Sequence, residues 1–256
     1  MDPTRRFSDR VEAYVAARPG YPRELAVLLA DELLLPPEAV VADIGCGTGL
    51  SCQPFLDAGL LVIGVEPNEP MRSAADRRYA AVPRFRSQRG SAEATGLRDA
   101  SVDLAVAGQA FHWFQPVPFA AELRRVLRPG GAVALFWNTR VHAATPFMAE
   151  YDALLIEHCP EYREKYRTDD LAAKHRAAML TVFGGQHWRE ADLPNVQELD
   201  RAGLVARVES DSYAPKPGDP GHPALVRALN ALFDRHQRER RVQIVYRTRI
   251  FFGRPQ

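Results

Sequence analysis

Cysteine, lysine and long apolar runs are all scarce in this chain of 256 residues. The three cysteines, Cys46, Cys52 and Cys159, are too few and too irregularly spaced for a disulfide framework or a zinc site. We therefore expect a reduced, cytoplasmic protein that holds no metal. No segment reaches the roughly 18 consecutive apolar residues of a membrane-spanning helix. The charged N-terminus also lacks the apolar stretch of a signal peptide.

Net charge is almost absent as well. The chain has 33 basic and 32 acidic side chains, which give a formal charge of +1 with neutral histidines. This balance argues against a protein that wraps nucleic acid or lies on an acidic membrane. We expect a small-molecule partner, no nucleic acid and no membrane. A monomer and a homodimer both stay open.

Strand-like and helix-like segments alternate between residues 39 and 139. Short apolar runs at Ala39–Ile44, Leu60–Val65, Ser101–Ala107 and Ala132–Trp137 are typical of buried strands, and segments of helical periodicity separate them. Strands that alternate with helices predict an α/β fold with a mostly parallel sheet covered on both faces.

The alternation of strand-like and helix-like segments stops after residue 139, where mostly helical segments follow. Later in the chain we expect a helix over Val196–Ala202, a strand over Leu204–Glu209 and an edge or hairpin strand over Val242–Phe252. The expected organisation has four parts: an N-terminal helical cap (1–38), a ligand-binding core (39–139), a helical lid or substrate insertion (140–193) and a C-terminal segment that completes the sheet (194–256).

The strongest local signal is the glycine turn in VVADIGCGTGL. A buried strand runs into Gly45, Gly47 and Gly49, so the backbone can approach a nucleotide-like ligand closely. Dinucleotide-binding turns favour G-x-G-x-x-G, but Leu50 stands at the third glycine position here, which disfavours a nicotinamide oxidoreductase. Glu66 ends the next strand, about 20 residues after the first glycine, where a carboxylate can accept hydrogen bonds from ribose hydroxyls.

Five motifs in series resemble those of the class I S-adenosylmethionine-dependent methyltransferases. They are DIGCGTG, GVEPN with Met71, GSAE, SVDLAVAGQAFHWF and RVLRPGGAVALFWN, in that order within residues 40–139. RFSDRVEAYVAARPGYP and QAFHWF are similar to small-molecule enzymes of the methyltransferase-11 type, including the trans-aconitate methyltransferase-like group. The resemblance implies a Rossmann-like, doubly wound sheet of seven strands with a helical lid insertion. It also implies S-adenosyl-L-methionine as cofactor and S-adenosyl-L-homocysteine as product.

The same resemblance implies a set of cofactor-binding residues. The Gly45 and Gly47 backbone lines the methionine part, with Asp43 as support and Cys46 packed between them as a small buried residue. Glu66 holds the ribose. The remaining expected contacts are Pro67, Asn68 and Met71 beside the adenine, Ser91, Ala92 and Glu93 at its ring and exocyclic amine, Gln109 toward the sulfonium, and Tyr14 and Arg18 over the methionine, with Arg18 toward its carboxylate.

The acceptor side of the site is expected around the fourth and fifth strands. His112 is the only histidine at a strand end expected to face the cofactor, which makes it the candidate catalytic base or substrate-orienting group. A structural role for His112 is equally open. Phe111, Trp113 and Trp137 are the candidate walls of the acceptor pocket, and His142 is a poorer candidate base.

The expected function is methyl transfer to an oxygen or nitrogen nucleophile of a small molecule, by in-line displacement at the sulfonium methyl group. Two alternatives stay open: a nucleic-acid or protein methyltransferase on the same fold, and a non-catalytic scaffold that binds S-adenosylmethionine. The strand end GQAFHWF lacks the Asn/Asp-Pro-Pro-aromatic pattern of amino-methylating nucleic-acid enzymes, which disfavours the first of these.

Overall fold

The computed structural model describes residues 17–165 and 171–255, and seven strands within that part form one sheet. The strands are β1 (Val40–Ile44), β2 (Leu61–Val65), β3 (Phe85–Gln88), β4 (Val102–Gly108), β5 (Leu127–Arg140), β6 (Arg189–Leu199) and β7 (Val242–Gly253). Their order is β3-β2-β1-β4-β5-β7-β6. The first five are parallel, and β7 runs antiparallel to both β5 and β6. The expected Rossmann-like, mostly parallel sheet is confirmed.

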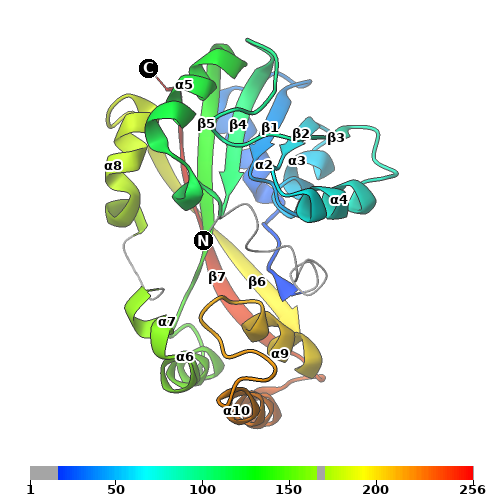
Figure 1. Cartoon of the computed structure of the whole chain (residues 1–256), viewed down its shortest axis with the longest axis vertical. Helices are drawn as coiled ribbons and strands as arrows, with labels where there is room; N and C mark the ends of the chain where they lie inside the picture. Colours follow the sequence, from blue (N-terminus) through cyan, green and yellow to red (C-terminus); the bar gives the residue numbers. More distant parts are fainter. Residues whose placement is uncertain (1–16, 166–170, 256) are drawn as a thin grey trace.

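Helices cover both faces of this sheet (Figure 1). They are α2 (Glu24–Leu33), α3 (Gln53–Asp57), α4 (Glu69–Arg78), α5 (Pro116–Val126), α6 (Pro146–His158), α7 (Pro160–Lys165), α8 (Leu171–Phe183), α9 (Arg201–Glu209), α10 (His222–His236) and the 3-10 turn η2 (Phe111–Trp113). Successive strand residues point to opposite faces, so Ala42 packs with α5 and α8 while Val41 packs with α2 and α3. Two apolar layers therefore enclose the sheet.

A third apolar cluster forms a smaller lobe at the far ends of β6 and β7 (Figure 1). It joins α6, α7, α9 and α10 to the first half of β7. The segment 140–193, expected as one lid, is thus divided in the structure. The helices α6 and α7 belong to the smaller lobe, whereas α8 packs against the sheet through Met179, Val182 and Phe183.

The elements between residues 189 and 209 differ from the prediction. The expected helix over Val196–Ala202 is wrong, because β6 extends to Leu199. The expected strand over Leu204–Glu209 is also wrong, because α9 occupies it. Strand β6 is an edge strand, so it tolerates Pro194 and leaves most of its side chains partly exposed, which hides the strand signal.

Helix α9 starts at a capping residue. The Asp200 carboxylate accepts a hydrogen bond from the backbone N–H of Gly203 over 2.7 Å, as N-caps do. Leu204 and Val208 then lie four residues apart on the buried face. The expected strand over Val242–Phe252 is confirmed as β7, but it lies inside the sheet between β5 and β6 and is not an edge strand.

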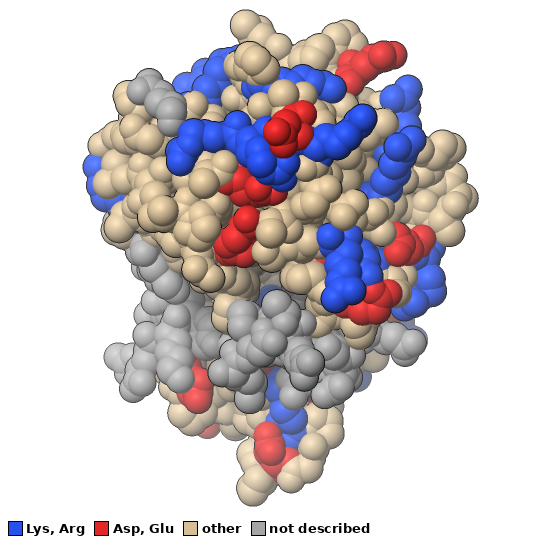
Figure 2. Space-filling view, turned by 45° about the horizontal axis from the view of Figure 1, so that its top comes forward, with Lys and Arg blue, Asp and Glu red and all other residues tan. Residues whose placement is uncertain are grey.

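Positive and negative side chains are mixed on the face that Figure 2 brings forward. Several arginines near the N-terminal ends of the strands are paired with acids: Arg125 with Asp99 and Glu122, and Arg128 with Asp103. Across the described ranges, no helix combines the length and apolar character needed to cross a membrane.

Candidate functional site

A cleft of about 860 Å³ lies where the sheet meets the smaller lobe. One wall is made by the turns that follow β1, β2 and β4, so it occupies the carboxyl ends of the parallel strands. Ligands of open α/β sheets bind at this edge. The other wall comes from the end of β5 and from α9 and the loop after it.

The glycine turn after β1 forms the narrow part of the cleft. Gly45 and Gly47 have φ of +71° and +56°, a left-handed conformation that favours glycine. A Cβ at Gly45 would lie only 2.8 Å from the Cβ of Ala110, so a side chain there does not fit. Gly49 has a structural role instead, because its carbonyl accepts a hydrogen bond from the Tyr79 hydroxyl over 2.7 Å. Two of the three glycines therefore shape a cradle open to a ligand.

Glu66, at the end of β2, is fixed beside this cradle. Its carboxylate accepts a hydrogen bond from the N–H of Gly47 over 3.0 Å and another from the N–H of Asn68 over 2.8 Å. Burial raises the pKa of Glu66, and these two hydrogen bonds oppose the rise. Each carboxylate oxygen keeps a further lone pair for a ligand hydroxyl.

Asp43 lies under the turn and does not line the cleft. One of its oxygens accepts hydrogen bonds from the Ser51 hydroxyl over 2.6 Å and the Cys52 thiol over 3.0 Å. The other oxygen is buried without a hydrogen-bond partner among the described residues. Burial raises the pKa of Asp43 to about 6, and the hydrogen bonds from Ser51 and Cys52 limit the rise. These contacts agree with the expectation that Asp43 supports the glycine turn.

The cleft brings together most of the residues expected from the sequence. Those that line it are Arg18, Gly45, Cys46, Gly47, Glu66, Pro67, Asn68, Met71, Ser91, Ala92, Glu93, Gln109, His112, Trp113 and Trp137. Phe111 does not; the expectation that it forms a pocket wall is wrong, because its ring is only 2% exposed and packs in the core under the cleft. Tyr14 lies outside the described residues.

Two of these residues also fix the local backbone. Gln109, just after β4, has φ of +56°, an unusual value for a residue with a side chain, and its N–H donates to the Phe136 carbonyl over 2.9 Å. Such backbone strain is often found at functional sites. The Glu93 carboxylate accepts a hydrogen bond from the N–H of Gln115 over 2.9 Å, which ties the loop after β3 to the start of α5.

Residues 42–135 match the methyltransferase domain family. They include the glycine turn, Glu66 and the strand end at Gln109. This part of the chain belongs to the methyltransferase domain family.

Relatives and solved structures agree with this assignment. The chain is 42% identical over 135 residues to an uncharacterized methyltransferase of Mycobacterium tuberculosis, and the aligned segment covers 52% of each chain. It is 32% identical over 177 residues to one of Schizosaccharomyces pombe, which covers 69% of this chain and 66% of the other. The chain spans about half the length of the first of these curated relatives. A solved protein of Anaeromyxobacter dehalogenans, assigned as a type II methyltransferase, has a TM-score of 0.70 at 26% identity and covers 93% of this chain and 99% of its own.

The residues of this cleft fit the adenosyl cofactor of the family. Gly45 and Gly47 leave the cradle free of side chains, and Glu66 faces it with lone pairs to spare. Pro67 and Met71 lie on the same wall, where an adenine ring needs apolar contacts. The residues along this wall of the cleft therefore fit the ribose and adenine parts of such a cofactor.

An aromatic wall of the cleft lies beside Gln109. His112 is exposed on η2, and its ring centroid lies 4.9 Å from that of Trp113. His175, from α8, stacks on Trp137 with the ring centroids 5.3 Å apart and the planes within 6°. Sequence reasoning missed His175, because α8 reaches the cleft only through the fold and its helical pattern carries no motif.

Sequence reasoning also missed the charged wall on the smaller lobe. Arg140 donates to Asp211 over 3.0 Å, and Arg207 and Arg18 approach the same carboxylate at 2.9 and 3.2 Å. Burial alone raises the pKa of Asp211, but the three guanidinium charges outweigh it and hold that pKa far below its usual range. Arg18, expected to approach the methionine carboxylate, is thus paired with Asp211 in this structure.

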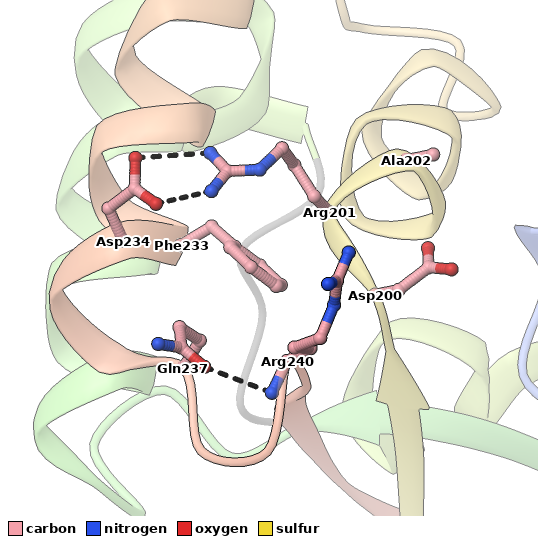
Figure 3. A pocket seen from close by; sticks show the side chains of 7 residues that line it. All are labelled: Asp200, Arg201, Ala202, Phe233, Asp234, Gln237 and Arg240. Carbon is pink, nitrogen blue, oxygen red and sulfur yellow. Dashed lines mark hydrogen bonds and ion pairs between the residues drawn. The ribbon is translucent and has the colours of Figure 1, made fainter.

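A second, more open hollow lies between α9 and α10 (Figure 3). Its Arg201 and Asp234 form a two-pronged ion pair, and the backbone N–H of Arg240 donates to the Gln237 side chain over 3.0 Å. Both partners of the ion pair are about half exposed, with side-chain exposures of 47% and 61%. Exposed pairs of this kind contribute little, and no predicted site residue lies there, so the interlobe cleft is the candidate site.

Proposed function

We propose that this protein transfers a methyl group from S-adenosylmethionine to an oxygen or nitrogen nucleophile of a small molecule. One observation carries the proposal: a single cleft joins the Gly45–Gly47 cradle and Glu66 to an aromatic wall that contains His112 and Trp137. When bound, S-adenosylmethionine supplies a methyl group on a positively charged sulfur. The protein has to hold a donor at one wall and orient an acceptor at the other, and proximity and orientation of this kind can contribute about 7–11 kcal/mol in favourable cases.

The donor wall binds through backbone and carboxylate groups. Glu66 accepts hydrogen bonds from the ribose hydroxyls, and the Gly45–Gly47 backbone leaves room for the methionine part. Pro67 and Met71 border the adenine, and the N–H of Ala92 faces its ring, with Ser91 and Glu93 near the exocyclic amine. This set is supported by the location of these residues along the cleft.

The acceptor wall orients the nucleophile and excludes water. Trp137 is buried with 4% exposure, and Trp113 is 41% exposed at the cleft, so the two present apolar surface at different depths. His112 is exposed beside them, where its ring can orient an acceptor hydroxyl or amine or take its proton. Because the cleft is enclosed by two lobes, a small molecule is a better acceptor than an extended polymer.

The four-part organisation is proposed in the same terms. The core of residues 39–139 holds the donor and supplies the aromatic part of the acceptor wall, and the segments 140–193 and 194–256 together form the rest of the acceptor side. The location of α6, α7, α9 and α10 in one apolar cluster supports this shared role.

Methyl transfer from labelled S-adenosylmethionine to a metabolite panel tests the proposal. We expect labelled small-molecule product with the wild-type protein, and less of it with Glu66→Ala at a donor concentration near the wild-type Kd. Label in DNA, RNA or protein instead of any small molecule would overturn the proposed acceptor class. Binding of S-adenosylhomocysteine without transfer to any of these acceptors would favour the non-catalytic scaffold.

A further inference from the structure

The charged wall of the smaller lobe gathers three arginines around one carboxylate. Arg18, Arg140 and Arg207 share the single carboxylate of Asp211, and the side chains of these four residues are only 20%, 12%, 4% and 5% exposed. Lys216 adds another cation, whose ammonium group donates to the backbone carbonyl of Glu209 over 2.6 Å. A buried charged group is costly when one of its donors stays unpaired, so an unpaired donor on this wall favours an anionic partner.

Another acid of this region, Asp152 on α6, is engaged elsewhere. It accepts a hydrogen bond from the Tyr162 hydroxyl over 2.8 Å, and His142 Nδ1 lies 2.8 Å from the same oxygen. Arg140 and His142 are two residues apart in the chain, and each is paired with its own carboxylate: Arg140 with Asp211 and His142 with Asp152.

One hydrogen-bond donor of Arg140 is not used by the described residues around it. One of its terminal nitrogens serves Asp211 and the Tyr213 hydroxyl, while the other, Nη1, is buried with no hydrogen-bond partner among the described residues. The guanidinium carbon lies 5.4–5.9 Å from the ring centroids of Tyr151, Tyr162 and Tyr213. These rings surround a fixed planar donor, and Arg140, Tyr162 and Tyr213 all line the cleft. A carboxylate oxygen can accept a charge-assisted hydrogen bond from this nitrogen.

The position of Arg140 separates it from the donor wall. Phe136 on β5 pairs with Gly108 at the end of β4, and Arg140 lies four residues further along the same strand. At roughly 3.3 Å per residue this is about 13 Å beyond the strand end that leads to Gln109. Trp137 lies between these levels and lines the cleft. An anion held at Arg140 is therefore well placed to belong to the acceptor and poorly placed to be the carboxylate of the methionine part.

We propose that Arg140 is the centre of an anion-binding subsite that holds a carboxylate group of the methyl acceptor. The acceptor is then an acid whose nucleophile reaches the aromatic wall while its carboxylate lies on the smaller lobe. Arg207 and Arg18 hold Asp211, which in turn fixes one edge of the Arg140 guanidinium. This inference rests on the proposed function, because it names the acceptor class of the same cleft.

Ligand binding to the protein saturated with S-adenosylhomocysteine tests this subsite. The probes are a panel of aliphatic and aromatic carboxylic acids, each with its primary amide, titrated in a calorimeter. We expect at least one acid to bind and its amide to bind more weakly by about tenfold or more, because the amide lacks the charge that strengthens a hydrogen bond. If every acid binds no better than its amide, the proposal is wrong.

Variants locate the effect. Arg140→Met should weaken binding of that acid by about tenfold or more, whereas Arg201→Met, at the exposed pair of the α9–α10 hollow, should leave it unchanged. Arg140→Lys keeps the charge without the planar fork and should also bind the acid more weakly, which covers the case in which Arg140→Met does not fold. Unchanged affinity for the acid in the folded Arg140 variants would contradict the subsite.

The source of the anion is resolved by the affinity for S-adenosylhomocysteine alone. We expect Arg140→Met to bind it as tightly as the wild-type protein does. If Arg140→Met loses that affinity, the anion belongs to the cofactor and the acceptor subsite is wrong. If the wild-type protein binds no S-adenosylhomocysteine at all, the proposed function itself fails, so the two failures are distinguishable.

Discussion

The backbone N–H of Gly47 donates a hydrogen bond to the Glu66 carboxylate over 3.0 Å, which ties the turn after β1 to the end of β2. The same carboxylate accepts from the N–H of Asn68, the residue that caps α4. One side chain thus fixes two neighbouring turns at the carboxyl edge of the sheet. Its remaining lone pairs face the cleft, so the group that organises the donor wall is also the group that can bind a ribose.

Glu66→Ala should therefore weaken the affinity for S-adenosylhomocysteine by about tenfold or more, since hydrogen bonds to charged groups contribute roughly 1.5–3 kcal/mol. Glu69→Ala, in the first turn of α4, removes an exposed carboxylate nearby and serves as the matched control. Isothermal titration calorimetry measures both. Equal affinities for the two variants would remove Glu66 from the site.

Gly45→Ala should destabilise the fold and abolish donor binding. The left-handed φ alone costs roughly 1–2 kcal/mol for a residue with a Cβ, and at Gly45 that Cβ also meets Ala110 at 2.8 Å. Gly59→Ala is the control, because Gly59 has φ of +78° with no neighbouring atom within 4 Å. Urea unfolding should give a larger loss for Gly45→Ala than for Gly59→Ala. Similar losses would show that the close approach at Gly45 does not matter.

Asp43 should make the folded state less stable as pH rises. Its folded pKa, about 6, lies above the reference value of 3.8, so the folded protein holds this proton more tightly than the unfolded chain does. Stability from this group is full below pH 3.8 and is lost as pH rises to about 6, by roughly 3 kcal/mol at about 1.4 kcal/mol per pH unit.

Asp43→Asn removes this titration. The free energy of unfolding of the variant, relative to wild type, should therefore be higher at pH 7.5 than at pH 4, and urea unfolding at the two pH values measures it. Titrating groups that do not interact with Asp43 cancel in this difference. A difference that does not change with pH would contradict the buried, proton-binding state of Asp43.

His112→Ala should lower methyl transfer to an identified small-molecule acceptor and leave S-adenosylhomocysteine binding intact, because the side chain is exposed on the acceptor wall. Single-turnover transfer from labelled donor measures the first effect and calorimetry the second. His142→Ala is the comparison, since His142 is held by Asp152 on the smaller lobe. Full transfer activity in His112→Ala would assign His112 a structural role.

The donor wall could be predicted from the sequence because its parts are local. Each strand of the core is a short apolar run, and the residues that line the cleft follow directly after it, as Gly45 follows β1 and Glu66 follows β2. Strand order then needs only the rule that parallel strands end at one edge. Between residues 40 and 139, the residues of the sequence motifs are therefore the same ones that the fold brings to the cleft.

The charged wall of the cleft could not be predicted in this way. Arg207 and Asp211 lie only four residues apart, but Arg140 comes from β5, and only tertiary packing brings it to them. The edge strand β6 has few buried residues and contains Pro194, so its pattern is weak. His175 reaches the cleft from a helix about 60 residues beyond the motif at His112, and no local spacing signals their approach.

Thermal unfolding with and without S-adenosylhomocysteine tests the central claim, that this cleft binds the adenosyl donor, most directly. At a concentration about 100 times its Kd, a ligand of the folded state adds about 2.7 kcal/mol, which for a chain of this size raises the Tm by roughly 5–10 °C. We predict that rise with S-adenosylhomocysteine and no change with NAD. An unchanged Tm with saturating S-adenosylhomocysteine, or an equal rise with NAD, would contradict the account.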